Sequence, residues 1–123
     1  MQTETWSGKK YEFKNENETR KIFEKILGVR FLKVRGVFSN KKLELDGYAT
    51  NCGPNKDIKI GFEYQGKQHY EYIEYFHGND PKKLTEQQQR DQIKRDECKN
   101  LGIFLLEIPY YIIDKKDFIR NKL

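Results

Sequence analysis

Two carboxylates in neighbouring alternating stretches are the residues of this chain that are best placed to do chemistry. Asp46 lies in the segment LELDGYA and Glu63 in the segment IKIGFEYQ, each on the polar side of its pattern. Turn-forming residues 51–55 separate the two segments, so the pattern predicts a hairpin with both acids on adjacent strands. Close carboxylates repel each other unless a cation lies between them, and oxygen ligands suit Mg²⁺. The pair therefore predicts a divalent-metal site, although exposed strands also carry acids without function.

Polar side chains downstream could complete such a site. His69 follows the turn at Gly66, and its unperturbed pKa of about 6.5 suits a general acid or a phosphate donor, although it could instead only organise the loop. Gln87, Asp91 and Lys94 lie on one face of a predicted helix, which is either aimed at the site or solvated. We expect Asp91 to restrain Lys94 through an i, i+3 contact.

The three motifs LELDGY, FEYxGxQHY and RDxxK occur here in this order. As a set they resemble the PD-(D/E)xK nuclease superfamily, and in particular its very-short-patch-repair-like endonuclease branch, many of whose members come from phages and large DNA viruses. The resemblance covers roughly residues 16–110. It implies a restriction-endonuclease-like αβββαβ core and a Mg²⁺-dependent DNA endonuclease that hydrolyses phosphodiester bonds, with Mn²⁺ able to substitute. DNA is the implied partner, and a homodimer is a further expectation.

The same resemblance implies roles for individual residues. Gln65 stands where the motif has lysine, and glutamine cannot remove a proton but can hold a water by hydrogen bonds. Lys94 is the expected substitute for the missing lysine, whereas Lys67 follows a turn that fixes its direction poorly. Glu16 is either a further metal ligand or an acid that interacts with the helix dipole. The expected catalytic residues are Asp46, Glu63, Gln65, His69 and Lys94, the expected metal ligands are Asp46, Glu63 and Glu16, and the expected substrate-binding residues are Gln68, Arg35, Arg90 and Lys67.

Local signals predict the elements that must position these residues. A helix is expected to begin near Asn15 or Asn17, with residues 1–14 flexible and Trp6 and Tyr11 as possible anchors. The continuous apolar run 103–108 predicts a strand that is buried on both faces at the centre of the sheet. The expected order is a helix to residue 27, strands 31–37, 43–49 and 58–65, helix 84–101, strand 103–108 and a short helix capped by Asp114.

Composition sets the remaining bounds. The 123 residues suit one domain, which the resemblance implies is an α/β nuclease domain with a mixed central sheet flanked by helices, and the net charge of +5 suits a polyanionic partner. Two cysteines and two histidines give no disulfide framework and no zinc spacing. The chain has no membrane-spanning apolar run and no secretory signal, which predicts an intracellular protein of the cytoplasm or nucleus. Alternative functions are a branched-DNA resolvase of the Holliday type and an inactive nucleic-acid-binding module of the same fold.

Overall fold

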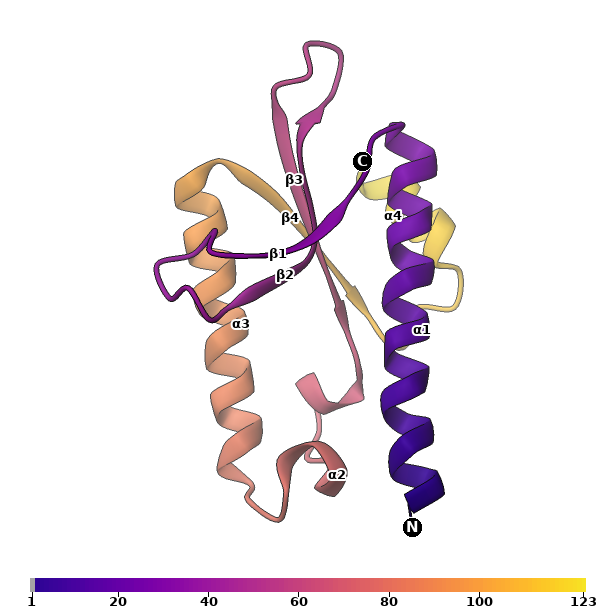
Figure 1. Cartoon of the computed structure of the whole chain (residues 1–123), viewed down its shortest axis with the longest axis vertical. Helices are drawn as coiled ribbons and strands as arrows, with labels where there is room; N and C mark the ends of the chain where they lie inside the picture. The colour runs from indigo at the N-terminus through magenta and orange to yellow at the C-terminus, as the bar shows by residue number, and fades with distance from the viewer. Residues whose placement is uncertain (1) are drawn as a thin grey trace.

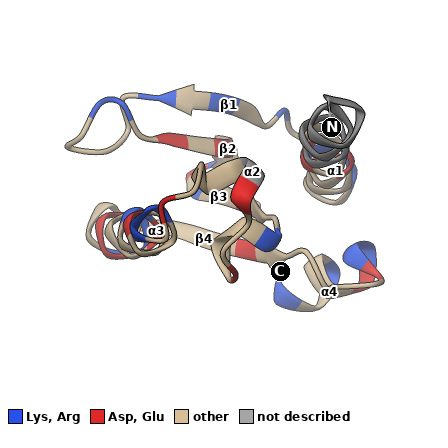
Figure 2. Ribbon diagram, turned by 90° about the horizontal axis from the view of Figure 1, so that it is seen from below, with Lys and Arg blue, Asp and Glu red and all other residues tan. Residues whose placement is uncertain are grey.

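Four strands form one mixed sheet with helices on both of its faces (Figures 1 and 2). The computed structural model describes the backbone of residues 2–123 and the side chains of residues 13–123 other than residue 75. The elements are α1 (Gln2–Leu27), β1 (Leu32–Arg35), β2 (Glu44–Cys52), β3 (Ile58–Gln65), η1 (Lys67–His69), α2 (Glu74–His77), α3 (Lys82–Leu101), β4 (Ile103–Pro109) and α4 (Lys115–Lys122).

The sheet has the order β1-β2-β3-β4, with antiparallel pairs β1/β2 and β2/β3 and a parallel pair β3/β4. Helix α3 is the crossover that the parallel pair requires. The predicted α/β class and the αβββαβ order are therefore confirmed. The predicted central position of the last strand is wrong, because within the described residues β4 pairs only with β3. Phe104 on this edge strand is 45% exposed, so β4 is not buried on both faces.

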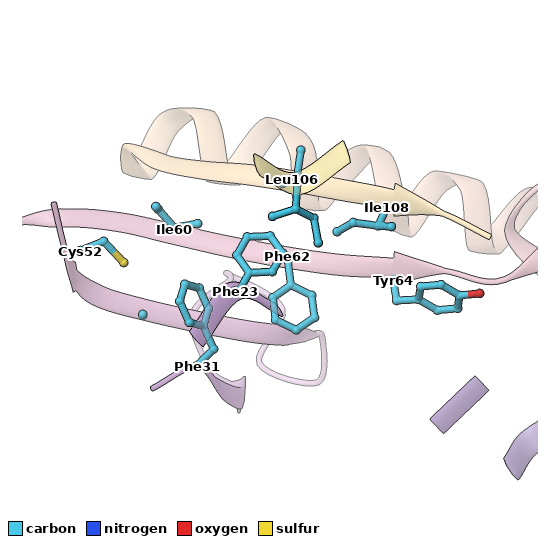
Figure 3. Packing of buried hydrophobic residues seen from close by; sticks show 10 residues of the cluster. Phe23, Phe31, Cys52, Ile60, Phe62, Tyr64, Leu106 and Ile108 are labelled. Atoms are coloured by element: carbon cyan, nitrogen blue, oxygen red, sulfur yellow. The ribbon is translucent and has the colours of Figure 1, made fainter. Parts of the chain in front are cut away.

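Two hydrophobic clusters hold β3 from opposite faces of the sheet. On one face the rings of Phe23, Phe31 and Phe62 pack together, with Phe23 and Phe62 stacked at 4.8 Å between centroids (Figure 3). On the other face Leu45 and Cys98 belong to a second cluster, beneath α3. Cys98 is thus a core residue, as its place in the helix predicts. Clamping β3 between two packed layers fixes the direction of its polar side chains.

Helix α1 begins at Gln2 rather than near Asn15, so the predicted start is wrong, whereas the predicted end at Leu27 is confirmed. Asn15 does not act as a cap: its side-chain oxygen accepts a hydrogen bond from Lys115 Nζ at 2.7 Å, which ties α1 to α4. The backbone of residues 2–14, the segment predicted to be flexible, forms the first part of this helix, whereas the side chains of Trp6 and Tyr11, the predicted anchors, lie outside the described residues.

Gly47 is needed for packing inside strand β2. A Cβ atom added there would lie 1.9 Å from a ring carbon of Phe62, which is far inside any allowed contact. A glycine inside a strand commonly weakens it, but β2 continues through Gly47 to Cys52. Because Gly47 has no side chain, the Phe62 ring can pack against the backbone of β2. This close contact keeps β2 and β3 paired as far as Gly47 and Phe62, next to Asp46.

Candidate active site

Strands β2 and β3 end their regular pairing at Gly47 and Phe62, and Asp46 and Glu63 lie immediately beyond this last pair. Each carboxylate then binds the backbone of the opposite strand. The Asp46 N–H donates to Glu63 Oε2 at 2.9 Å, and the Tyr64 N–H donates to Asp46 Oδ2 at 2.9 Å. Where the two strands separate, hydrogen bonds from backbone N–H groups to these carboxylates thus replace the backbone–backbone hydrogen bonds of the sheet. We call Asp46 and Glu63 the carboxylate fork, and the predicted hairpin that brings them together is confirmed.

Burial makes it unfavourable for the two acids of the fork to be ionised. Burial, together with the charges of Glu63 and Glu16, raises the pKa of Asp46 to about 8, against the opposing effects of the Tyr64 N–H and the Lys94 ammonium. Burial likewise raises the pKa of Glu63, although Lys94 works in the opposite direction. With both acids ionised the site would hold more negative charge than the neighbouring lysine balances, so without a metal one acid keeps its proton, and a further cation could take the place of that proton.

Lys94 reaches the fork from α3. Its Nζ donates to Glu63 Oε1 at 2.8 Å, and its side chain is only 15% exposed. The helix face that carries Lys94 borders a cleft of about 400 Å³, which also exposes Asp46, Arg90 and His69. The stripe of Gln87, Asp91 and Lys94 is therefore aimed at the site rather than solvated. Motif spacing identified this lysine correctly as one that reaches the acids.

His69 is oriented by a chain of hydrogen bonds. Its Nδ1 lies 2.8 Å from Asp91 Oδ2, and its Nε2 lies 3.3 Å from the amide nitrogen of Gln87. The amide oxygen of Gln87 faces His77 Nε2 at 3.4 Å, and His77 Nδ1 accepts from the Ile73 N–H at 2.9 Å. If the network is followed from the Ile73 N–H, each donor faces the next acceptor toward Asp91, so that His69 donates from Nδ1 to Asp91 and accepts at Nε2 from Gln87.

The hydrogen bonds of His69 and Glu63 contradict one expectation about α3. Asp91 binds His69, while Lys94 binds Glu63, so the expected restraint of Lys94 by Asp91 is wrong. A helix residue bonds to whichever partner the tertiary fold places against it, and both partners here come from β3 and the turn after it. The orienting role of Asp91 and Gln87 was missed, although their i, i+4 spacing on one face already aligned them.

Gln65 has both ends of its amide engaged away from the cleft. Its Nε2 donates to Glu107 Oε2 at 2.5 Å, and its Oε1 accepts from the Tyr70 hydroxyl at 2.6 Å. Glu107 also accepts from Arg95 Nε at 2.7 Å. Gln65 is buried and does not border the cleft that holds Asp46. Sequence reasoning missed Glu107, although it is the single charged residue of the apolar run IFLLEI.

Glu16 faces the fork, as its position at the edge of the apolar stripe predicts. It is 8% exposed and lies 3.3 Å from both Arg20 Nη2 and Lys33 Nζ. Burial lowers the pKa of Lys33, but the negative charges of Glu16 and Asp46 outweigh this effect and raise the pKa overall. Arg20 also donates to the backbone carbonyl of Asp46. Glu16 thus contributes to the negative field at the fork while forming its own ion pairs.

Of the four expected substrate-binding residues, only Arg90 borders the cleft. Arg35 is exposed and pairs with Glu44 at 2.6 Å. Lys67 is exposed in η1 and lies 3.8 Å from Glu71, so its default interpretation as a solvated charge agrees with the structure. Gln68 is buried. These three positions flank the site without lining it.

The fork matches a divalent cation in the type of its donors, since Mg²⁺ prefers carboxylate oxygens. Among the residues that the structure describes, no group of three His, Cys, Asp or Glu side chains is arranged to hold a metal ion. Lys94 accounts for part of this, because its ammonium already binds one oxygen of Glu63. Any cation at the fork must therefore share Glu63 with Lys94 or displace it.

The fold and the site define an α/β protein with a buried acid pair at the parting of two strands, facing a cleft with basic residues on α3. The chain belongs to the same family as uncharacterized protein 094L of Frog virus 3 (isolate Goorha), with 39% identity over 117 residues, which is 91% of this chain and 72% of that protein. No family model matches the sequence, and no solved structure matches it significantly.

Two further relatives are proteins of iridescent viruses, and both are described as uncharacterized. Protein 033L of Invertebrate iridescent virus 3 is 36% identical over 85% of this chain, which spans 53% of that protein. Protein 307L of Invertebrate iridescent virus 6 is 38% identical over 72% of this chain, which spans 41% of that protein. The viral source of these relatives agrees with the origin that the motifs imply. In the described part of the chain, no helix is long and apolar enough to span a membrane.

Proposed function

We propose that this chain is a metal-dependent DNA endonuclease of the PD-(D/E)xK type, acting within the infected cell. The observation that carries the proposal is the carboxylate fork: two acids from adjacent strands, buried side by side, of which Asp46 lines the cleft and Glu63 lies behind it and is bonded to Lys94. A structural sheet gains nothing from burying such a pair, because burial disfavours the charged form of each acid. A site that binds a cation and phosphate gives the pair a function.

Asp46 and Glu63 are the residues that would hold Mg²⁺, with Glu16 close enough to influence the same ion. Bound Mg²⁺ would supply an activated water and would stabilise the negative charge that develops on the phosphate and the leaving oxygen. The raised pKa of both fork carboxyls supports this assignment, since a divalent cation stabilises their ionised forms. The backbone N–H groups of Asp46 and Tyr64 keep the carboxylates oriented before any cation arrives.

The basic residues of the cleft are assigned to the phosphates. Lys94 holds its ammonium beside the fork, where it can neutralise a phosphate oxygen, and Arg90 lies one helical turn before it. His69 is oriented by Asp91 at Nδ1 and by Gln87 at Nε2, so once Nε2 leaves Gln87 it presents a lone pair to the cleft, and its role is to accept a hydrogen bond or a proton there. Gln65 supports this arrangement by tying η1 to β4 through Tyr70 and Glu107.

A second candidate is a nucleic-acid-binding module without catalysis. The contact between Lys94 and Glu63 favours it, because an ammonium that already neutralises Glu63 makes a metal unnecessary for stability. In this alternative the cleft binds phosphates and the fork is a buried ion pair. The two candidates differ in one respect only: the module binds DNA in the presence of Mg²⁺ and leaves it intact.

The test is incubation of the purified chain with supercoiled, linear and branched DNA in Mg²⁺, Mn²⁺ or EDTA. The proposal expects cleavage with either metal and none in EDTA, and a strong preference for the branched substrate would assign the chain as a resolvase. Asp46→Asn is the critical variant, and Asp57→Asn, which alters an exposed acid in the turn after β2, is its control. Intact DNA in all conditions, with binding retained, would reject catalysis in favour of the binding module.

A further inference from the structure

Two exposed tyrosines, Tyr70 and Tyr111, form an aromatic surface beside the site together with Tyr110, which is half-buried and packs against the core. The rings of Tyr70, Tyr110 and Tyr111 lie 5.5 to 5.9 Å apart between centroids, at the carboxyl ends of β3 and β4. Tyr70 is 38% exposed and Tyr111 is 61% exposed. We call these three residues the tyrosine ledge. Clustered ring faces that stay in water are uncommon in soluble proteins and mark surfaces that bind a partner.

The ledge is fixed by hydrogen bonds to the sheet and to the turn after it. The Tyr70 hydroxyl donates to Gln65 Oε1 at 2.6 Å, and the backbone N–H of Tyr110 donates to the Gln65 carbonyl at 2.8 Å. The Tyr110 hydroxyl donates to Glu71 at 3.2 Å. The rings are thus held before a ligand arrives, which lowers the entropy cost of stacking on them.

The position of the ledge relates it to the cleft. His69 borders the cleft, and Tyr70 is the next residue along the chain, so the two surfaces meet at η1. A polynucleotide that places its phosphates against Arg90 and Lys94 would pass His69 and continue over the rings. Glu71 accepts from the Tyr110 hydroxyl and Glu107 from the Gln65 amide, so acids lie next to the ledge and disfavour any anionic group there, phosphates included. The part of a nucleic acid strand that suits the rings is therefore its uncharged bases.

We propose that the tyrosine ledge stacks unpaired nucleobases of a single-stranded DNA segment that continues out of the cleft, an inference that rests on the proposed nuclease function. Nucleobases offer the flat, uncharged faces that tyrosine rings bind, and stacking on aromatic side chains tolerates any base. In an uninterrupted duplex these faces are covered by the neighbouring base pairs. The substrate class is therefore DNA with an unpaired segment next to the cleaved bond, such as a flap, a gap or a single strand.

The test measures DNA binding in EDTA, so that no cleavage occurs, by fluorescence anisotropy with three probes. The probes are a single-stranded oligonucleotide, the same oligonucleotide with abasic sites in place of its central nucleotides, and the matching duplex. Because the abasic probe keeps every phosphate, its weaker binding isolates the contribution of the bases. We expect the intact strand to bind at least about tenfold more tightly than the abasic strand.

Variants test whether the difference in affinity between the intact and the abasic strand comes from the tyrosine ledge. Tyr111→Ala should remove most of the preference for the intact strand and leave the abasic probe unaffected, whereas Tyr111→Phe should retain the preference. Phe104→Ala is the matched control, because Phe104 is 45% exposed at the opposite end of β4. Tyr111→Ala adds no buried cavity, so its folding is expected to be unaffected, and circular dichroism checks this.

The outcomes separate this inference from the function on which it rests. Equal affinity for intact and abasic strands, with metal-dependent cleavage retained, would overturn the ledge and leave the nuclease standing. Failure to bind any probe and to cleave any DNA would overturn both. If Tyr111→Ala leaves DNA binding unchanged but converts a dimer to a monomer in sedimentation, the ledge is a contact between two copies and the inference is overturned.

Discussion

Glu63 and Glu107 are neighbours in exact register on the parallel strands β3 and β4, and the same helix serves both. Consecutive residues of α3 reach them: Lys94 binds Glu63 at 2.8 Å, and Arg95 binds Glu107 at 2.7 Å. The two ion pairs look alike in their partners and distances. They differ in what surrounds them, and that difference separates a candidate site from a structural contact.

Glu107 is satisfied where it lies, because its second oxygen accepts from the Gln65 amide and its side chain is 24% exposed. Glu63 is only 6% exposed and has Asp46 as its other neighbour. One ammonium there faces two acids and cannot balance both in their ionised forms, and burial raises the pKa of both carboxyls. Charge imbalance, rather than the presence of a buried ion pair, is therefore what marks the fork as able to take up a cation.

The largest expected effect is on cleavage when a fork acid is neutralised. Asp46→Asn or Glu63→Gln should lower the rate by at least about a hundredfold, because each removes an oxygen ligand from the metal. DNA binding should stay the same or tighten, since less negative charge faces the phosphates. Glu107→Gln is the control that keeps the volume and should leave the rate nearly unchanged. Single-turnover cleavage assays measure the rates, and equal losses at Glu63 and Glu107 would remove the distinction between them.

A smaller effect is expected when the lysine of the fork is removed. Lys94→Gln should lower the single-turnover cleavage rate by at least about tenfold, because a positioned positive charge near phosphate is lost. Lys67→Gln should mainly weaken binding, since Lys67 is exposed and outside the cleft. Calorimetry should show Mg²⁺ affinity undiminished in Lys94→Gln, because the ammonium competes for Glu63. The reverse order of the two cleavage rates would assign the missing motif lysine to the turn.

The charge imbalance also predicts how stability depends on pH in metal-free buffer. In the folded protein Asp46 keeps its proton up to about pH 8, whereas the ordinary pKa of an aspartate side chain is 3.8. The folded state therefore binds more protons between these values, and its free energy of unfolding falls as pH rises through that window. Asp46→Asn cannot ionise and should gain about 1–3 kcal/mol relative to the wild type between about pH 5 and about pH 8. Chemical denaturation at both values would show it, and parallel pH profiles would contradict the raised pKa.

The smallest effect is expected at the satisfied pair. Arg95→Gln breaks an ion pair in which the arginine is 41% exposed, so the loss of stability should be about 0.5–1 kcal/mol. The metal dependence of cleavage should stay as in the wild type. Thermal unfolding provides the measurement. A change in metal affinity in this variant would mean that the two ion pairs are coupled and cannot be treated separately.

Much of the fold could be predicted because its signals are local. Alternation along β2 and β3, the turn between them and the αL glycine after α1 each depend on a few neighbouring residues. The edge position of β4 could not be read from its sequence, since a continuous apolar run looks the same at the centre and at an edge. The early start of α1 was hidden for a similar reason, because the polar residues before Asn15 lack an apolar stripe.

The candidate site divides in the same way. The motif spacing correctly predicted that Asp46, Glu63 and Lys94 lie close together, because hairpin geometry and helix periodicity fix the directions of their side chains. It could not show that Gln65 is bonded to Glu107, since that contact joins positions 42 residues apart and depends on the register of β3 and β4. Residues whose partners come from a distant strand are recognised only after the sheet is assembled.

Gly47 and Asp46 are adjacent in the chain but are required for different reasons, so homologues should keep or lose them independently. In the proposed function the aspartate would serve the reaction, whereas the glycine is required by the Phe62 ring, which leaves no room for a methyl group. A lineage that abandoned catalysis would be free to replace Asp46 but would still be obliged to keep the glycine. Homologues with glycine and no acid before it are therefore the expected remnants of lost enzymes, whereas loss of both residues together would indicate that the sheet itself has been rebuilt.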